Sequence, residues 1–385
     1  MKKVRIGVIG IGNMGTAHAL SLYHQEIPGA EIAAVADVRE ERLAWAENNL
    51  NGVQLFNNED DFFQSDGIDA IIIAVPHGAH PRLAAKAFER GLHVLCEKPA
   101  GIHTKQVKEM NQKAIESNCV FSMMFNQRTS PLYQKVRDLV RSGELGEVKR
   151  INWIITNWYR SQSYYDSGGW RATWEGEGGG VLINQSPHQL DLWQWITGMM
   201  PSRIRAFCYF GKNRDIEVED EVTAFAEYEN GATGVFITST GEAPGTNRLE
   251  ITGERGKIVV EDSRLTFWRL RVPEPEFNKQ FTGGFGEPEC WKCEVPVTGK
   301  ETGHHGILKN FSSAVLHGEP LLAPGEEGLN SLTLSNAMQL SAWTDNWVEL
   351  PFDGDLYLHH LQENINKSTV NKKDINLTLN VDNTH

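Results

Sequence analysis

The chain has 385 residues, which is enough for two domains that each bury a core. Its 50 acidic and 37 basic residues give a formal net charge of −13, which argues against nucleic acid or an anionic membrane as a main partner. Apolar runs stay well short of the roughly 18 residues of a membrane-spanning helix, and the basic start at Met1 leads into a strand without a signal-peptide cleavage site. We therefore expect a cytoplasmic protein.

The first forty residues carry the most informative pattern. An apolar strand over residues 4–10 runs directly into a glycine-rich turn and then into a helical pattern over residues 13–25. Gly10 permits a tight turn, Gly12 lets the backbone approach a pyrophosphate, and Gly15 lets the helix pack against the strand. The free N–H groups at the start of the helix then hold the phosphates. The predicted phosphate-binding residues are Gly10, Gly12, Asn13, Met14 and Gly15.

The second apolar run, residues 31–37, ends in a carboxylate, Asp37, about 20 residues after the glycines. A carboxylate at this position binds both hydroxyls of an adenosine ribose and repels a 2′-phosphate, which favours NAD over NADP. Arg39, two residues later, can accommodate that phosphate. NAD is therefore the expected cofactor, and NADP stays open as an alternative.

Apolar strands alternate with amphipathic helices as far as residue 125. The predicted strands are 4–10, 31–37, 69–75, 92–96 and 120–125, and the predicted helices are 13–25, 40–49, 79–90 and 103–118. This alternation predicts a Rossmann domain over residues 1–125, a parallel sheet covered by helices on both faces. Ligands bind beyond the carboxyl ends of such strands. The residues expected to line the cofactor cleft there are Pro76, His77, Glu97 and Lys98.

The pattern changes after about residue 145. Short strand-like segments are separated by Gly, Asn and Pro turns, at 149–158, 203–210, 222–228, 232–238, 248–251 and 257–261. They predict an open, mostly antiparallel sheet, with helices near 187–197 and 304–317. The predicted second domain, for substrate binding and oligomerisation, covers residues 126–352. Residues 353–385 are expected to form a helix near 355–366 and a loosely held polar tail.

The five cysteines give little evidence of chemistry. Cys96, Cys119 and Cys208 lie in apolar, strand-like runs and are expected to be small core residues in a reducing compartment. Cys290 and Cys293 form a single Cys-x-x-Cys without a second pair, which is weak evidence for zinc or redox chemistry. We therefore predict strand or loop packing for them and no metal site.

Lys98 is the first candidate for chemistry. It follows a buried strand and precedes Pro99, whose ring biases Lys98 towards an extended conformation. The side chain should therefore project from the carboxyl edge of the sheet, where the nicotinamide is expected. A lysine partly withdrawn from water has a lowered pKa and can exchange a proton with a substrate hydroxyl.

A second group of candidates lies in the run from Gly178 to Asp191. If this run is one helix, Asn184 and His188 share a face one turn apart. Alternatively, Ser186 and Pro187 cap a helix that begins there. His188 could bind a substrate hydroxyl or accept its proton. Asp191 is expected to be structural, either bonding neighbouring backbone or holding His188.

Three motifs together resemble the glucose–fructose oxidoreductase / inositol dehydrogenase / rhizopine catabolism (Gfo/Idh/MocA) family of sugar and cyclitol dehydrogenases. They are the glycine turn, Glu97-Lys98-Pro99, and the run from Gly178 to Asp191, and the resemblance covers residues 3–352 in order and spacing. It implies that Lys98 and His188 are catalytic. It also implies that the segment ending at Arg128 leads into the second domain and that Trp170 and Arg171 lie on a loop near the substrate.

The sequence departs from the family where Asp usually stands four residues before the histidine, because Asn184 occupies that position. An amide orients a hydroxyl but takes no proton, so the proton would fall to His188 or Lys98. By resemblance, a sugar, glycoside or cyclitol hydroxyl is oxidised to a ketone, or the reverse, by hydride transfer to nicotinamide C4. Asn184, Arg128 and Arg171 would hold the other hydroxyls, and rings such as Trp170 would stack on the sugar.

Two other functions stay open. One is a glycosidase that uses bound NAD in a transient oxidation–elimination cycle, and the other is a non-catalytic NAD-binding regulatory protein. The joint presence of Lys98 and His188 argues against the second, because a regulator has no need of both. As in relatives of the resembled family, a homodimer or homotetramer through the C-terminal sheet is expected.

Overall fold

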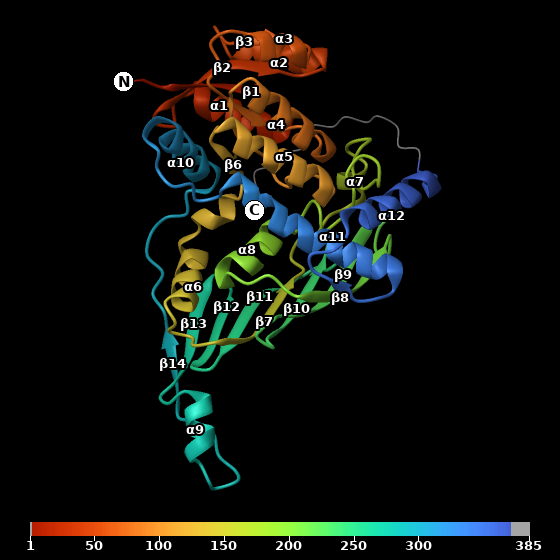
Figure 1. Ribbon diagram of the computed structural model, residues 1–385. Coiled ribbons are helices and arrows are strands. Elements are labelled where there is room, and N and C mark those ends of the chain that lie inside the picture. The colour runs from red at the N-terminus through yellow and green to blue at the C-terminus, as the bar shows by residue number, and fades with distance from the viewer. Residues whose placement is uncertain (1, 371–385) are drawn as a thin grey trace.

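The computed structural model describes residues 2–370, which form two sheets with a layer of helices between them (Figure 1). The first sheet and its helices occupy one end of the molecule, and the larger second sheet lies towards the other end. Within residues 2–370, none of the helices has both the length and the apolar character that crossing a bilayer requires. The predicted polar tail lies mostly outside the described residues.

The first sheet is a parallel Rossmann sheet with the strand order β3-β2-β1-β4-β5-β6. Its strands are β1 (Val4–Ile9), β2 (Ala30–Ala36), β3 (Gln54–Phe56), β4 (Ala70–Ile73), β5 (His93–Cys96) and β6 (Phe121–Met123). The chain order reverses between β1 and β4, which places the ligand crevice beyond the carboxyl ends of these two strands. The sheet confirms the predicted fold class and adds β3, which we did not predict.

Helices cover both faces of this sheet. They are α1 (Asn13–Tyr23), α2 (Glu40–Asn49), α3 (Glu59–Gln64), α4 (His80–Glu89) and α5 (Thr104–Ser117), with a short 3₁₀ turn η1 (His77–Ala79) before α4. Strand β4 is buried along its whole length, as expected for a parallel strand with helices on both sides. Four of these helices match the predicted ranges closely, and α3 was missed.

The second sheet has nine strands in the order β14-β13-β12-β11-β7-β10-β9-β8-β15. They are β7 (Val148–Ile155), β8 (Arg203–Phe210), β9 (Glu219–Glu227), β10 (Thr233–Ser239), β11 (Asn247–Gly253), β12 (Gly256–Glu261), β13 (Arg264–Leu270), β14 (Cys290–Glu294) and β15 (Val348–Glu349). All neighbours pair antiparallel except β7 and β10, which are parallel. The predicted, mostly antiparallel sheet is confirmed.

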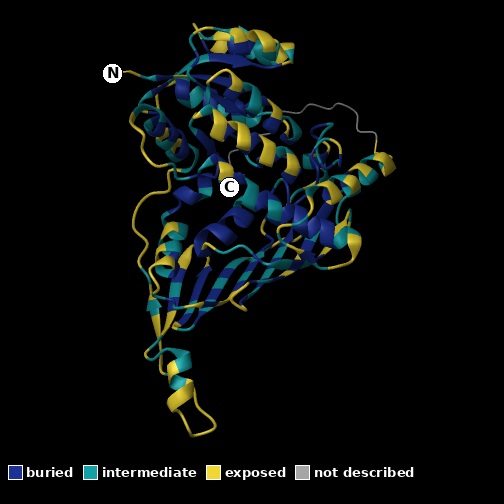
Figure 2. Cartoon of the chain, in the orientation of Figure 1, coloured by how far each residue is buried: buried dark blue, intermediate teal, exposed yellow. Residues whose placement is uncertain are grey.

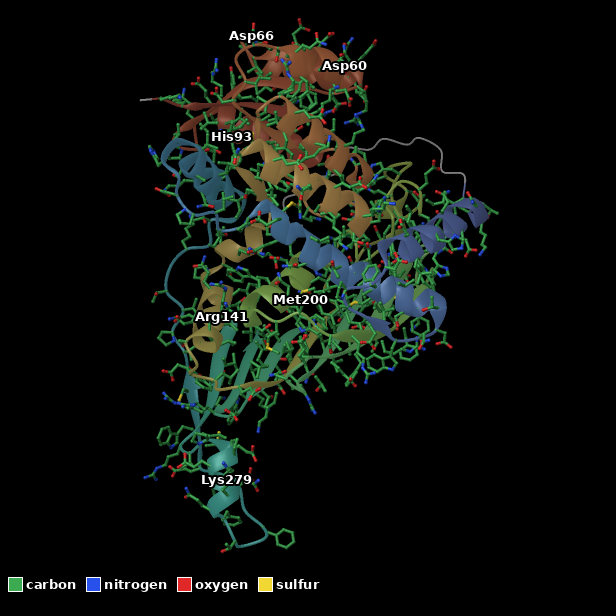
Figure 3. All side chains as sticks on the ribbon, in the orientation of Figure 1. Asp60, Asp66, His93, Arg141, Met200 and Lys279 are labelled. Atoms are coloured by element: carbon green, nitrogen blue, oxygen red, sulfur yellow. The ribbon has the colours of Figure 1, made fainter. Side chains whose placement is uncertain are left out.

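One face of this sheet is covered by helices and the other is left open. Burial alternates along β9, the pattern of a strand with one covered face. The covering helices are α6 (Pro131–Arg141), α8 (Pro187–Thr197) and α11 (Gly328–Thr344), and side chains fill the space between them and the sheet (Figure 3). Smaller elements are η2 (Asn126–Thr129), α7 (Gln162–Tyr165), η3 (Gly325–Glu327) and α12 (Gly354–Lys367).

The chain returns to the first domain after it has built most of the second. Helix α10 (Gly303–His317) places Ile307, Leu308 and Phe311 in the same core as strands β1 to β6. Its His304 ring lies 5.6 Å from that of His18 on α1. The linear division at residue 125 did not anticipate that a later helix completes the first core.

A long hairpin projects from the edge of the second sheet. It carries α9 (Glu274–Gln280), on which Lys279 lies (Figures 1 and 3), and none of the α9 residues is buried. Figure 2 shows the tip of the arm as largely exposed. Cys290 and Cys293 lie at the base of this arm in β14, facing Leu270 and Phe267 of β13 in the ladder. The predicted strand is confirmed, but Cys290 is exposed and only Cys293 is partly buried.

Candidate active site

The glycine turn between β1 and α1 has the shape that a pyrophosphate needs. Gly10 has a φ of +85°, and a Cβ there would lie 2.5 Å from the carbonyl oxygen of Ala74. A Cβ on Gly15 would lie 1.8 Å from the carbonyl oxygen of Gly10, so the first turn of α1 packs against the loop only because this residue is glycine. A Cβ on Gly12 would meet only a terminal nitrogen of Arg39, at 3.9 Å. The turn therefore fits a dinucleotide phosphate.

Asp37 lies at the carboxyl end of β2, next to the glycine turn. One carboxylate oxygen accepts from the backbone N–H of Ile11 at 3.0 Å. The other accepts from the backbone N–H and from Nε of Arg39, at 3.0 and 3.2 Å. A second guanidinium, that of Arg42, donates to the carbonyl oxygen of Ile11 at 2.7 Å. The structure thus keeps the acidic side chain at the predicted ribose position, with Arg39 directly beside it.

Glu97 forms a buried pair with α1. Its Oε1 lies 2.8 Å from Nε2 of His18, and its Oε2 accepts from the backbone N–H of Lys98 at 3.2 Å. Although burial opposes it, the hydrogen bond and charge of His18 lower the pKa of Glu97 to about 2. This carboxylate therefore remains charged and fixes the backbone from which Lys98 projects.

Lys98 reaches from the first domain to the second. Its Nζ donates to the backbone carbonyl of Asn184 at 2.8 Å. Burial lowers the pKa of Lys98, and the nearby charges of Arg171 and Arg160 lower it further, against the opposing effect of Glu97 and Glu177. The amine is therefore easier to deprotonate than an exposed lysine.

Glu177 is a site residue that the sequence analysis missed. It is 1% exposed, it accepts from the backbone N–H of Ala172 at 2.6 Å, and it accepts a short hydrogen bond from the side-chain amide of Asn184. Burial raises its pKa, and the charges of Arg171 and Lys98 oppose that shift. An acidic residue directly before three glycines, in a run that later supplies a histidine, was the signal that could have found it.

Trp170 and Arg171 lie beside this carboxylate, close to Tyr164 of α7. Arg171 Nη1 donates to the Tyr164 hydroxyl at 2.9 Å, and its guanidinium lies 4.7 Å from both the Tyr164 and the Trp170 ring centroids. The Trp170 ring meets His77 edge-on, with 5.3 Å between centroids. Burial lowers the pKa of His77 well below its ordinary value, so this ring is neutral. Together these residues wall the region around Lys98.

His188 lies in the first turn of α8, which begins at Pro187 with Ser186 as its N-cap. The second of our two expectations for this segment therefore holds. Asn184 precedes the helix in a turn, where its backbone N–H donates to the carbonyl of Gly180 at 2.9 Å. The half-buried His188 ring lies edge-on to Phe125, with 6.2 Å between centroids. Lys98 thus contacts the backbone four residues before His188.

Arg128 does not occupy the position that we predicted for it. Its side chain is fully buried, and Nε and Nη2 donate to the two carboxylate oxygens of Asp191 at 2.7 and 2.6 Å. Nη1 donates to Glu327 at 2.5 Å and to the carbonyl of Leu322 at 3.1 Å. Because every guanidinium nitrogen is engaged, we reassign Arg128 from substrate binding to a structural ion pair, and Asp191 holds Arg128.

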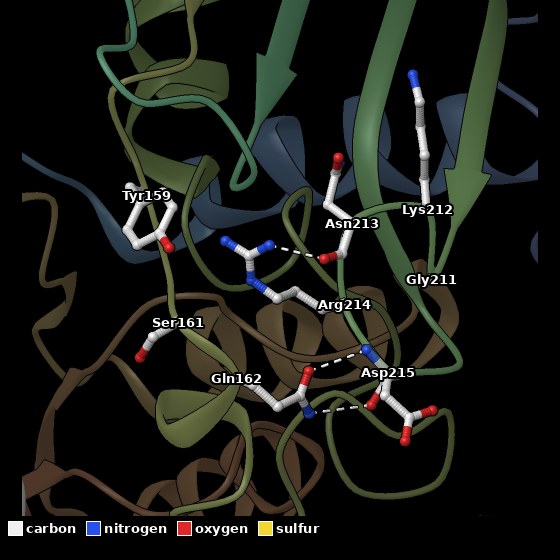
Figure 4. Close-up of a pocket in the computed structure, with 8 residues that line it drawn as sticks. All are labelled: Tyr159, Ser161, Gln162, Gly211, Lys212, Asn213, Arg214 and Asp215. Atoms are coloured by element: carbon white, nitrogen blue, oxygen red, sulfur yellow. Dashed lines mark hydrogen bonds between the residues drawn. The ribbon is translucent and has the colours of Figure 1, made fainter.

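A separate pocket of about 540 Å³ lies at the turn between β8 and β9 (Figure 4). Its lining residues are Tyr159, Ser161, Gln162, Gly211, Lys212, Asn213, Arg214 and Asp215. Gln162 bonds the backbone of Asp215 through both side-chain atoms, at 2.9 and 3.2 Å. Lys98 and His188 are not part of this lining, so the pocket is distinct from the candidate site.

Comparison with known proteins matches both halves of the chain to one family. Residues 4–125 match an oxidoreductase family with an NAD-binding Rossmann fold, and residues 133–259 match the GFO/IDH/MocA C-terminal domain. Myo-inositol 2-dehydrogenase of Thermotoga maritima is 25% identical over 354 residues, covering 90% of this chain and 98% of that protein. Levoglucosan dehydrogenase of Pseudarthrobacter phenanthrenivorans is 23% identical over 392 residues, covering 91% and 99%.

A solved structure supports the same family assignment. The WlbA dehydrogenase of Bordetella pertussis, in complex with NADH and UDP-GlcNAcA, has a TM-score of 0.78 and 26% identity and covers 91% of this chain and 100% of that one. Both sheets, the glycine turn and the two family matches therefore indicate the same family. The chain belongs to the Gfo/Idh/MocA oxidoreductase family and is an NAD-binding enzyme, as its motifs predicted.

Proposed function

We propose that this enzyme is an NAD-dependent dehydrogenase that oxidises a secondary hydroxyl of a sugar or cyclitol to a ketone, or catalyses the reverse reaction. The observation that carries the proposal is the contact between Nζ of Lys98, at the cofactor edge, and the backbone of Asn184, in the segment that supplies His188. This contact brings the amine of one domain to the imidazole-bearing segment of the other. The proposal is also supported by relatives that are named as dehydrogenases.

The glycine turn and Asp37 would hold the dinucleotide, with Gly12 beneath the phosphates and the carboxylate at the ribose. When bound, NAD supplies the acceptor for the hydrogen and electron pair of the substrate C–H bond. The O–H proton leaves to Nζ of Lys98. Its lowered pKa gives a larger share of neutral amine near neutral pH, so that Nζ can accept the proton.

Asn184 and Glu177 act together in this proposal. The side-chain amide of Asn184 donates to Glu177, which fixes the orientation of the amide and turns its carbonyl oxygen away from the carboxylate. A substrate hydroxyl can donate to that oxygen. Glu177 supplies the negative charge that relatives are expected to carry at the position of Asn184, and His188 binds the reacting hydroxyl beside Lys98.

The test is a substrate panel of inositols, aldoses and glycosides, offered to the purified protein with NAD and with NADP in separate reactions. We expect accumulation of NADH with at least one cyclitol or sugar, and a lower kcat/KM with NADP because Asp37 repels the 2′-phosphate. Release of a free alcohol from a glycoside without net NADH would instead identify the transient-oxidation glycosidase. The absence of turnover with every compound would contradict the proposal.

A further inference from the structure

The candidate site holds more basic than acidic side chains, although the whole chain is acidic. Three basic side chains gather there, Lys98, Arg160 and Arg171, and both arginines lower the pKa of Lys98 through their charge. Glu177 is one carboxylate that faces Lys98 and Arg171. Glu97 is paired with His18 and also raises the pKa of Lys98, so two carboxylates face these three side chains. A neutral sugar would offer no negative charge to the two guanidinium groups.

Arg160 is held in place, but no acidic side chain within the described residues 2–370 pairs with it. Its backbone N–H donates to the carbonyl of Thr240 at 3.0 Å, and Nη1 donates to the carbonyl of Tyr159 at 2.9 Å. The guanidinium lies 5.5 Å from the ring centroid of Trp158 and 5.2 Å from that of Tyr164. Within residues 2–370, its buried Nε has no hydrogen-bond acceptor. A preorganised guanidinium with an unused N–H is suited to receive an anion.

Arg171 approaches the same tyrosine. Its Nη1 donates to the Tyr164 hydroxyl, and its guanidinium also lies over the Tyr164 ring, at 4.7 Å. The hydroxyl of Tyr164 also accepts a hydrogen bond from the side-chain amide nitrogen of Asn184, at 3.2 Å. One aromatic ring therefore gathers both guanidinium groups next to the residue that we expect to orient the substrate.

The backbone around Arg160 is braced from the other side. Arg214, in the separate pocket of Figure 4, donates from Nε to the carbonyl oxygen of Arg160 at 2.7 Å, and its guanidinium lies 5.0 Å from the Tyr159 ring centroid. This bond restrains the Arg160 backbone.

We propose that the substrate is an anionic sugar, whose carboxylate or phosphate is bound by Arg160 and Arg171 beside Tyr164. This inference rests on the proposed dehydrogenase function and narrows its substrate class. The planar guanidinium fork matches a carboxylate or a phosphate and forms paired, charge-assisted hydrogen bonds with either. The anionic group anchors the sugar, and the reacting hydroxyl faces Lys98 and His188.

The test compares matched compounds on the full-length protein with NAD. Glucose, glucuronate and glucose 6-phosphate form one set, and galactose with galacturonate forms another. We expect kcat/KM to be at least about tenfold higher for an anionic member than for its neutral partner, and this preference to shrink as ionic strength rises. The carboxylate and phosphate arms show which anion the two arginines accept.

Variants assign the preference to the arginines. Arg160→Gln should lower the ratio of anionic to neutral kcat/KM about tenfold or more, and Arg160→Lys should restore part of that ratio because the charge returns without the fork. Arg269→Gln is the matched control, because Arg269 lies on β13 and pairs with Glu144 at the surface. A ratio unchanged in Arg160→Gln and in Arg171→Gln would overturn the inference.

Binding separates this inference from the proposed function. The thermal shift that glucuronate or glucose 6-phosphate causes in the NADH-bound protein needs no turnover. A shift with the anions, absent with glucose and reduced in Arg160→Gln, supports the anion site even if the panel yields no NADH. Equal turnover of neutral and anionic sugars, with equal thermal shifts, would rule out the anion site and would still support the dehydrogenase function.

Discussion

The charges of Lys98 and Glu177 each shift the pKa of the other group. Burial lowers the pKa of the amine and raises the pKa of the carboxyl, so each group is pushed towards its neutral form, while the charge of each opposes that shift in the other. Removing the carboxylate therefore changes the proton affinity of the amine, even though the two groups share no hydrogen bond that the structure records.

This coupling predicts the pH profile. Oxidation needs the neutral amine, so kcat/KM should rise with pH through the pKa of Lys98, and that rise should lie below the ordinary lysine value of about 10.4. Glu177→Gln removes a charge that raises the pKa of Lys98, so the rising limb should move to lower pH. The measurement is kcat/KM against pH for both proteins. A limb that stays in place or moves to higher pH contradicts the coupling.

Motifs predicted only part of the candidate site. Lys98 and His188 were proposed from short patterns and from the family resemblance that those patterns carry. Glu177 has only a weak local signal, the three glycines that follow it. Arg160 lies in a loop that is held by contacts with a distant segment, such as its bond to Thr240, so no local pattern marks it. Arg128 was misassigned because the sequence does not show that its guanidinium meets Asp191, 63 residues away.

The reassignment of Arg128 predicts a loss of stability and not of substrate affinity. Arg128→Met leaves the buried carboxylate of Asp191 and the partly exposed carboxylate of Glu327 without their partner, and breaking a buried ion pair costs about 3–5 kcal/mol of unfolding free energy. Urea unfolding should show this loss. Arg264→Met, at an exposed position of β13, serves as a control. Unchanged stability together with a raised KM would restore the role in substrate binding.

At the scale of elements, α11 shows where periodicity fails. This helix is buried on nearly all sides, and small polar residues share the buried positions with Leu and Met, so it has no polar face to contrast with an apolar one. Asn336 donates to the carbonyl of Ile102, and Ser341 accepts from the backbone of Ala206. Helices with two distinct faces, such as α4 and α6, bury only part of their residues.

A buried carboxylate ties α11 to the site. Glu219 of β9 accepts from the backbone N–H groups of Gly180 and Leu182, at 2.9 and 3.2 Å, and from the side chain of Gln339 on α11. Burial raises its pKa to about 7, against the effect of these bonds. Glu219 thereby anchors the glycine run that leads to Asn184.

Glu219 makes stability depend on pH. The folded protein binds its proton more tightly than the unfolded chain, whose carboxyl has the ordinary value of 4.5, so its contribution to the free energy of unfolding falls as pH rises from 4.5 to about 7. Glu219→Gln should flatten the Tm profile in this window. The exposed Glu229→Gln provides a control. A profile as steep as that of the parent protein would contradict the role of Glu219.

At the scale of the whole molecule, the two sheets could be predicted and their joining could not. Strand and helix patterns placed most elements within a few residues. The return of α10 to the first core depends on packing between segments separated by more than 200 residues, which no local pattern encodes. The projecting arm around α9 could not be predicted from the sequence either, because Gly- and Pro-rich sequence is typical of many loops.

The open face of the second sheet predicts self-association, which we propose as the assembly mode. Aromatic side chains remain exposed on it, with Phe207 at 54% and Phe225 and Trp268 at 38%. Such a patch on a sheet favours a dimer or tetramer. Phe207→Asp should lower the mass measured by light scattering, whereas Phe285→Ser at the tip of the arm should not. A monomeric parent protein, or an unchanged mass in Phe207→Asp, would contradict this interface.

The central claim is that Lys98 handles the proton of an alcohol oxidised with NAD, and Lys98→Met tests it most directly. The single measurement is the rate of NADH formation with the best compound of the panel, at NAD concentrations shown by titration to saturate both proteins. We predict a loss of about 100-fold or more in Lys98→Met, while NADH binds with unchanged affinity. A variant that forms NADH at the parental rate would contradict the account.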